Sequence, residues 1–116
     1  MVKQTVKEKI RQRRSQMLIH SCLYYEMDQS IVDDYTWQRW ADELADLQKN
    51  NPKDCNIDFF DREFSDWDGS SGYHLPLRNE WVQAKAQYIL RIHEKSSVQS
   101  GEPVVQYTGN LEDFMQ

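Results

Sequence analysis

The segment from Asp34 to Pro52 constrains the fold most strongly, because its apolar residues fall on one face of a helix. These residues recur at three- and four-residue steps and are Trp37, Trp40, Ala41, Leu44 and Leu47. Asp34 is well placed to cap the start of this helix. The sequence Asn50-Asn51-Pro52 ends it, since Asn favours the C-terminal cap and a proline disfavours helical backbone angles in the preceding residue. We therefore expect an amphipathic helix after Asp34.

A second helix is expected on the N-terminal side, from Val6 to Met27. Its apolar positions share the same helical spacing and are Val6, Ile10, Met17, Leu18, Cys22 and Tyr25. Only the short polar stretch at residues 28–33 separates the two helices. Two helices joined by so short a loop pack as an antiparallel hairpin.

The rest of the chain predicts one more helix, an irregular segment and a tail. Pro76 suits a first helical turn, and a third long helix ending near Glu94 follows from the spacing of Trp81, Ala84, Tyr88, Ile89 and Ile92. Residues 53–75 are acidic and aromatic without a clear period, so we expect a short helix or turn near residues 58–64 and then an ordered loop. The predicted fold is all-α: a hairpin, a third helix packed across it, and this segment closing the core.

Length and composition limit the organisation of the chain. A sequence of 116 residues predicts one helical domain at residues 1–95, and the polar residues 96–116 predict a flexible C-terminal tail. Cys22 and Cys55 lie far apart without metal-ligand spacing, so neither a disulfide framework nor a metal site is indicated. There is no apolar run of membrane-spanning length and no signal peptide, which favours a cytoplasmic protein.

One stretch resembles a known family. It runs from Tyr24-Tyr25 through Asp28, Asp33-Asp34 and Trp37-Gln38, and continues through Glu43-Leu44 to Asn51-Pro52. This pattern is similar to the helical hairpin that opens bacterial NAD-dependent DNA ligases, and it covers about a third of the chain. In that family the hairpin binds the nicotinamide mononucleotide (NMN) half of NAD, with aromatic rings against the base and carboxylates near the ribose and amide.

By position, the resemblance implies that Tyr24, Tyr25 and Asp34 bind NMN or NAD. Trp37 stands where the family has Tyr, and Gln38 stands where it has an acidic residue. Trp can still stack, whereas Gln carries no full negative charge. The alternative is a hairpin in which the Tyr and Trp side chains are core residues and Asp34 is only a helix cap.

The catalytic part of a ligase is absent from the sequence. Ligases use an adenylated lysine in a Lys-x-Asp-Gly motif, and no lysine here is followed in that way. The nearest string is Asp66-Trp67-Asp68-Gly69, with an acid in place of the amine. No other catalytic constellation is recognisable, so a non-enzymatic binding protein is expected.

The acidic and aromatic segment predicts a protein-binding surface. Its candidate partner-binding residues are Asp58, Phe59, Phe60, Asp61, Phe64, Asp66, Trp67 and Asp68. Aromatic anchors ringed by carboxylates suit a protein interface. Small freestanding ligase-like hairpins look like proteins of bacteriophages or prophages, so a host protein is the partner this resemblance implies. The alternative is that the aromatics form the core of the domain.

The net charge of −5 hides a basic N-terminal helix that is a candidate for weak DNA binding. The candidate phosphate contacts are Lys7, Arg11, Arg13 and Arg14. No aromatic residues lie between them to stack on bases, so a solvated helix face is the alternative interpretation.

Overall fold

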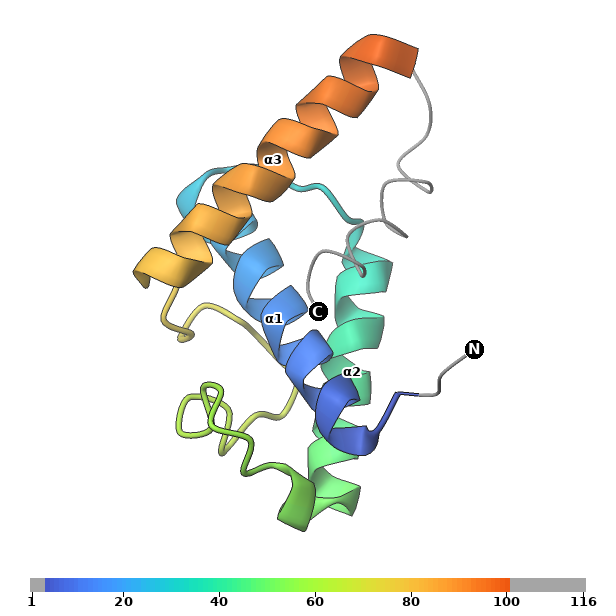
Figure 1. Ribbon diagram of the computed structural model, residues 1–116, viewed down its shortest axis with the longest axis vertical. Coiled ribbons are helices and arrows are strands. Elements are labelled where there is room, and N and C mark those ends of the chain that lie inside the picture. Colours follow the sequence, from blue (N-terminus) through green and yellow to red (C-terminus); the bar gives the residue numbers. More distant parts are fainter. Residues whose placement is uncertain (1–3, 101–116) are drawn as a thin grey trace.

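Three long helices make up the regular structure of the protein (Figure 1). The structure is a computed structural model that describes residues 4–100, with the side chains of residues 4–94. Along the chain lie α1 (Val6–Glu26), α2 (Asp34–Asn50), the short 3-10 helix η1 (Pro52–Asp54) and α3 (Glu80–Ser100). The described residues contain no strand, so the all-α fold expected from the sequence is confirmed.

Helix α1 begins where a capping box satisfies its first amides. The Thr5 side chain accepts a hydrogen bond from the Glu8 amide at 3.1 Å, and the Glu8 carboxylate accepts one from the Thr5 amide at 2.8 Å. Helix α2 is capped by Asp33, which accepts from the Thr36 amide at 2.7 Å. The expectation that Asp34 is the cap was wrong by one residue, and Asp34 lies in the first turn instead.

Helix α3 differs from expectation at both ends. Asn79 accepts hydrogen bonds from the amides of Trp81 and Val82, so the helix begins at Glu80, and Pro76 belongs to the preceding turn. At the other end the helix continues to Ser100, past the expected end near Glu94 and into the stretch predicted as a tail. The remainder of that predicted tail, residues 101–116, lies outside the described residues.

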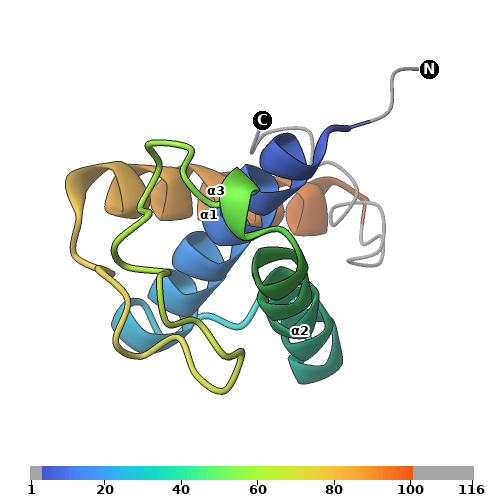
Figure 2. The same ribbon diagram turned by 90° about the horizontal axis from the view of Figure 1, so that it is seen from below.

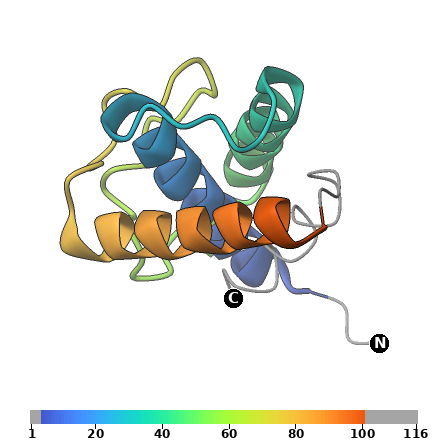
Figure 3. The ribbon, with the colours of Figure 1, turned by 90° about the horizontal axis from the view of Figure 1, so that it is seen from above.

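Helix α1 is the central element of the fold. Helices α2 and α3 both pack on it, and residues 55–79 form a long loop that runs beside it (Figures 2 and 3). Every residue from Gln12 to Leu23 is buried, polar ones included. A helix buried on all sides has no solvated face, so the polar side chains of α1 need partners inside the protein.

The loop is held to the core by the buried Arg14. Its guanidinium donates to the Asp61 carboxylate at 2.7 Å, to the Phe59 carbonyl at 2.7 Å and to the Cys55 carbonyl at 2.9 Å. The same guanidinium donates to Gln48 of α2 at 2.9 Å. Asp61 in turn accepts from the loop's own backbone amides, at Ile57, Asp58 and Phe59. One side chain of α1 therefore fixes both α2 and the course of the loop.

Three aromatic residues of this loop lie in the core. Phe64 has no exposed surface, and Phe59 and Trp67 are 8% and 7% exposed. Trp67 donates its indole N–H to the Ala41 carbonyl of α2 at 3.0 Å, and Phe60 is half-buried against Trp81 of α3. The expectation that Phe59, Phe64 and Trp67 form exposed anchors for a partner was therefore wrong. They cover the side of α1 that the other helices leave open.

Removing the Arg14 charge should unfold the protein more easily. In Arg14→Met the alkyl stem is kept, but Asp61 and two carbonyls lose their donor, so the free energy of unfolding should fall by about 3 kcal/mol or more. The measurement is urea denaturation followed by circular dichroism. Arg78→Met is the control, because the Arg78–Glu26 pair is at the surface and contributes only about 0–1 kcal/mol. Equal losses in the two variants would contradict the central role of Arg14.

The fall in the free energy of unfolding at acid pH should depend on Asp61. Burial opposes ionisation of its carboxylate, but the bonds from Arg14 and from three backbone amides outweigh burial and hold its pKa below the ordinary 3.8. Asp61 therefore stabilises the fold at any pH above its pKa in the unfolded chain. This stabilisation is lost as the pH falls through its lower pKa in the folded protein. Unfolding experiments from pH 6 to pH 2 should show a shallower acid limb for Asp61→Asn. Asp66→Asn, an exposed change on the same loop, should keep the wild-type slope.

Candidate functional site

A cavity of about 340 Å³ lies where the two helices of the hairpin meet their connecting segment. Its lining comes from the end of α1, the connection, the start of α2 and the loop before α3. The lining residues are His20, Ser21, Tyr24, Tyr25, Ser30, Ile31, Val32, Asp34, Trp37, Gln38, Ser70 and Ser71. The fold thus brings together four segments that the sequence separates.

All five residues that the ligase resemblance implicates line this one cavity. Tyr24 and Tyr25 sit in the last turn of α1, while Asp34, Trp37 and Gln38 occupy the first turns of α2. The antiparallel hairpin places these two turns next to each other. Residues chosen from a sequence pattern alone therefore share a single concave surface.

The tyrosines form an exposed aromatic rim. Tyr24 and Tyr25 are 56% and 40% exposed, and their ring centroids lie 4.9 Å apart in an edge-to-face arrangement. Tyr73 of the loop extends the rim, with its ring 5.2 Å from that of Tyr25. Water solvates exposed aromatic rings poorly, so a cluster of them on the surface is typical of a binding site. These tyrosines are not core residues.

The Asp34 carboxylate is not used to cap a helix. Asp33 performs that role, and its pKa is lowered by the hydrogen bonds from the Thr36 side chain and amide. Asp34 is exposed and lines the cavity. A negative charge is thereby left available at the cavity wall.

Gln38 anchors the loop wall of the cavity. Its side-chain amide donates to the Gly69 carbonyl at 2.8 Å and to the Asp42 carboxylate at 3.0 Å. Gly69 adopts a positive φ of 82°, which a residue with a side chain rarely tolerates. An acidic side chain at position 38, as in the ligase pattern, could not donate to that carbonyl. Glutamine in place of the acidic residue of the pattern therefore has a structural role here.

Gly72 closes the loop against α1 and α2. A methyl group built at this glycine would lie 2.9 Å from Cβ of Ser21, still closer to its hydroxyl, and 3.3 Å from the Trp37 ring. Only a residue without a side chain lets the loop backbone approach so closely. The approach fixes the positions of Ser21 and Trp37, two of the cavity's lining residues.

His20 and Ser21 are cavity residues that the sequence analysis did not identify. Both are buried, at 3% and 1% exposed, and both imidazole nitrogens and the Ser21 hydroxyl lack a hydrogen-bond partner in the described structure. Burial lowers the pKa of His20 to about 4, so its ring is neutral at pH 7. Only the fold reveals the cavity beside His20 and Ser21.

The cavity combines aromatic rings, hydroxyl groups and one carboxylate. No lysine or arginine is among its lining residues, and His20 is uncharged. Aromatic faces and a carboxylate together attract a flat cationic group. A phosphate group would find no side-chain cation in this lining.

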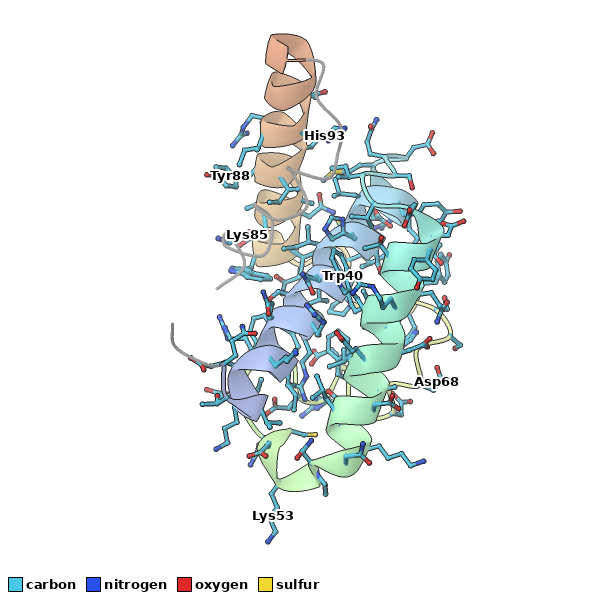
Figure 4. The ribbon with its side chains drawn as sticks, turned by 90° about the vertical axis from the view of Figure 1, so that its right-hand side faces the viewer. Trp40, Lys53, Asp68, Lys85, Tyr88 and His93 are labelled. Atoms are coloured by element: carbon cyan, nitrogen blue, oxygen red, sulfur yellow. The ribbon has the colours of Figure 1, made fainter. Side chains whose placement is uncertain are left out.

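A second, more open hollow of about 730 Å³ lies at the other end of α2. Asp46, Asp61, Asp66 and Asp68 contribute to its lining, together with Lys49 and the edge of Trp67. Three carboxylates of the expected partner surface, those of Asp61, Asp66 and Asp68, therefore border one hollow. Asp58, Asp66 and Asp68 are exposed, whereas Asp61 is engaged by Arg14. Figure 4 shows Asp68 at the surface beside α2, and Trp40 between α1 and α2.

The basic N-terminal helix offers less positive charge than its sequence suggests. Arg13 and Arg14 are 7% and 1% exposed, and they pair with Glu43 and Asp61. They are structural residues, so the expectation that they contact phosphates was wrong. Lys7 and Arg11 are exposed, and the Arg11 guanidinium lies 3.9 Å from the centre of the Phe59 ring.

Among the described residues, neither the Cys22 thiol nor the carboxylates form a reactive or metal-binding site. Cys22 is buried, and burial together with the Glu26 charge raises its pKa to about 11, which leaves it an unreactive thiol at pH 7. No group of three or more His, Cys, Asp or Glu side chains in residues 4–94 is arranged to hold a metal ion. None of the helices described combines the length and apolarity that crossing a membrane requires.

Comparison with known proteins gives no assignment. No family model matches the chain, and neither the curated proteins nor the solved structures contain a significant match. The likeness to the ligase hairpin therefore rests on the sequence residues that carry it.

Proposed function

We propose that the protein binds the nicotinamide nucleoside part of NMN or NAD in the cavity between α1 and α2, without catalysing a reaction. The observation that carries the proposal is the convergence of Tyr24, Tyr25, Asp34, Trp37 and Gln38 on one cavity. The end of one helix and the start of the next meet in any such hairpin, but here they also border a cavity lined by aromatic rings and a carboxylate.

The chemistry of the cavity supports this ligand. The nicotinamide ring of NMN and of oxidised NAD is a flat cation, which the aromatic rings of Tyr24, Tyr25 and Trp37 attract through their faces. The Asp34 carboxylate complements the same charge or accepts a hydrogen bond from a ribose hydroxyl. These contacts act on the ring and the sugar.

The size of the cavity limits how much of the ligand it encloses. Its volume of about 340 Å³ is at the small end of ligand pockets, which span roughly 300–1,000 Å³. A ring and a sugar fit this space better than a whole dinucleotide. We therefore place the phosphate and the adenosine half of NAD outside the cavity.

A protein partner on the acidic face is the weaker candidate. Three of the aromatic residues expected to anchor a partner are buried, so the hollow beside Asp66 and Asp68 offers charge without exposed anchors. DNA binding is weaker still, because Arg13 and Arg14 are enclosed in the core.

Asp34→Asn should weaken NMN binding without unfolding the protein. Isothermal titration calorimetry should show a saturable heat for the unaltered protein and an affinity loss of about tenfold, or 1.4 kcal/mol, when the charge is removed. Asp46→Asn, an exposed change elsewhere on α2, is the matched control and should bind normally. Asp33→Ala should instead lower the melting temperature through loss of the helix cap. The proposal is wrong if the unaltered protein gives no heat with NMN or NAD at millimolar concentration.

Nicotinamide riboside, which lacks the phosphate, should bind about as well as NMN. The reason is that no lysine or arginine lines the cavity to hold a phosphate. Since no phosphate contact is involved, any salt dependence of the affinity should come from the exposed Asp34 carboxylate and should be the same for NMN and the riboside. A riboside affinity far below that of NMN would place the phosphate in direct contact with the protein.

A further inference from the structure

Two polar side chains at the inner wall of the cavity have no hydrogen-bond partner among the described residues. His20 and Ser21 are each more than nine-tenths buried, and both line the cavity. Neither nitrogen of the His20 ring accepts or donates a hydrogen bond, and the Ser21 hydroxyl makes none. Buried polar groups are nearly always hydrogen-bonded, so partnerless groups beside a cavity mark where a ligand or water supplies the missing bonds.

The other partnerless polar atoms of the described structure differ in one respect. They belong to Ser15, Gln16 and Trp40, and none of these residues lines the cavity. His20 lies against Trp40, with ring centroids 5.5 Å apart, so the aromatic core supports the imidazole from behind. His20 and Ser21 thus combine burial and missing partners with a place in the cavity lining. Their polar atoms have almost no accessible surface here, and Gly72 covers the Ser21 hydroxyl, so a ligand reaches them only when the loop shifts.

The charge states of these groups define the ligand they fit. The neutral imidazole has one N–H donor and one nitrogen acceptor, and the Ser21 hydroxyl can donate and accept. No cation stands beside them in the lining, and the only charged group there is the Asp34 carboxylate. The inner wall is therefore suited to an uncharged group that itself donates and accepts hydrogen bonds.

We propose that His20 and Ser21 recognise the carboxamide of the ligand and exclude a carboxylate in its place. This inference rests on the proposed function and adds its specificity: the site takes nicotinamide-headed ligands and rejects nicotinate-headed ones. A carboxamide matches the donor and acceptor pairs of the two side chains. A carboxylate brings a negative charge into a buried wall without a positive partner, and it has no hydrogen to donate.

The experiment compares NMN with nicotinic acid mononucleotide by isothermal titration calorimetry on the full chain. The two ligands differ only in the carboxamide or carboxylate group, so ribose and phosphate contacts cancel. NMN should bind at least about tenfold more tightly, because a buried hydrogen-bonding group discriminates strongly against a ligand that leaves it unpaired. Equal affinities would overturn the inference and leave the proposed function standing. Failure of both ligands to bind would overturn the proposed function and the inference with it.

Ser21→Ala and Ser15→Ala provide a matched pair of variants. Each removes one buried, partnerless hydroxyl from α1, so neither should lower the melting temperature. Only Ser21 lines the cavity, so only Ser21→Ala should weaken NMN binding and narrow the preference for the amide. The same preference in both variants would show that the Ser21 hydroxyl does not contact the carboxamide, and would overturn its assignment. The preference surviving in Ser21→Ala and also in His20→Gln would overturn the inference as a whole.

Discussion

The buried guanidinium of Arg14 is the contact on which the rest of the structure depends. A loop without regular structure has backbone groups that water would normally satisfy, and here several of them face the core. Arg14 satisfies the carbonyls of Cys55 and Phe59, and through Asp61 it organises the amides of the same turn. With the loop ordered in this way, Phe59, Phe64 and Trp67 can cover the third side of α1.

The bounds of α1 and α2 were predictable from the sequence because local spacing encodes them. The stripe of α2 and its end at Asn50-Asn51-Pro52 gave its extent, and the bounds of α1 agreed with the periodicity of its apolar residues to within one position. Whether the charged residues are exposed or buried was not predictable in the same way. A run of arginines looks like a solvated face, and only tertiary packing decides that Arg13 and Arg14 point into the core. The aromatic segment was misleading for the same reason, because its composition suits an interface and an interior equally well.

The candidate cavity shows the same division between local and tertiary information. Its aromatic and acidic residues were proposed from a sequence pattern, whose spacing reflects a hairpin that brings the end of α1 to the start of α2. The loop residues Ser70 and Ser71 joined the cavity only through the fold, and nothing in their spacing links them to Tyr24. His20 and Ser21 were missed because their significance lies in hydrogen bonds they do not make. Such an absence is visible only when burial and neighbours are both known.

The two walls of the cavity differ in how they are built. One wall belongs to the hairpin, whose contacts join residues close in sequence, and such contacts form early and at small entropic cost. The other wall is the loop, which reaches the hairpin through the Gln38–Gly69 hydrogen bond and the close approach at Gly72. These two contacts can break without unfolding the helices, since proteins open locally at their least stable segments. Displacement of residues 69–72 would therefore uncover the Ser21 hydroxyl, which Gly72 covers, while α1 and α2 stay paired.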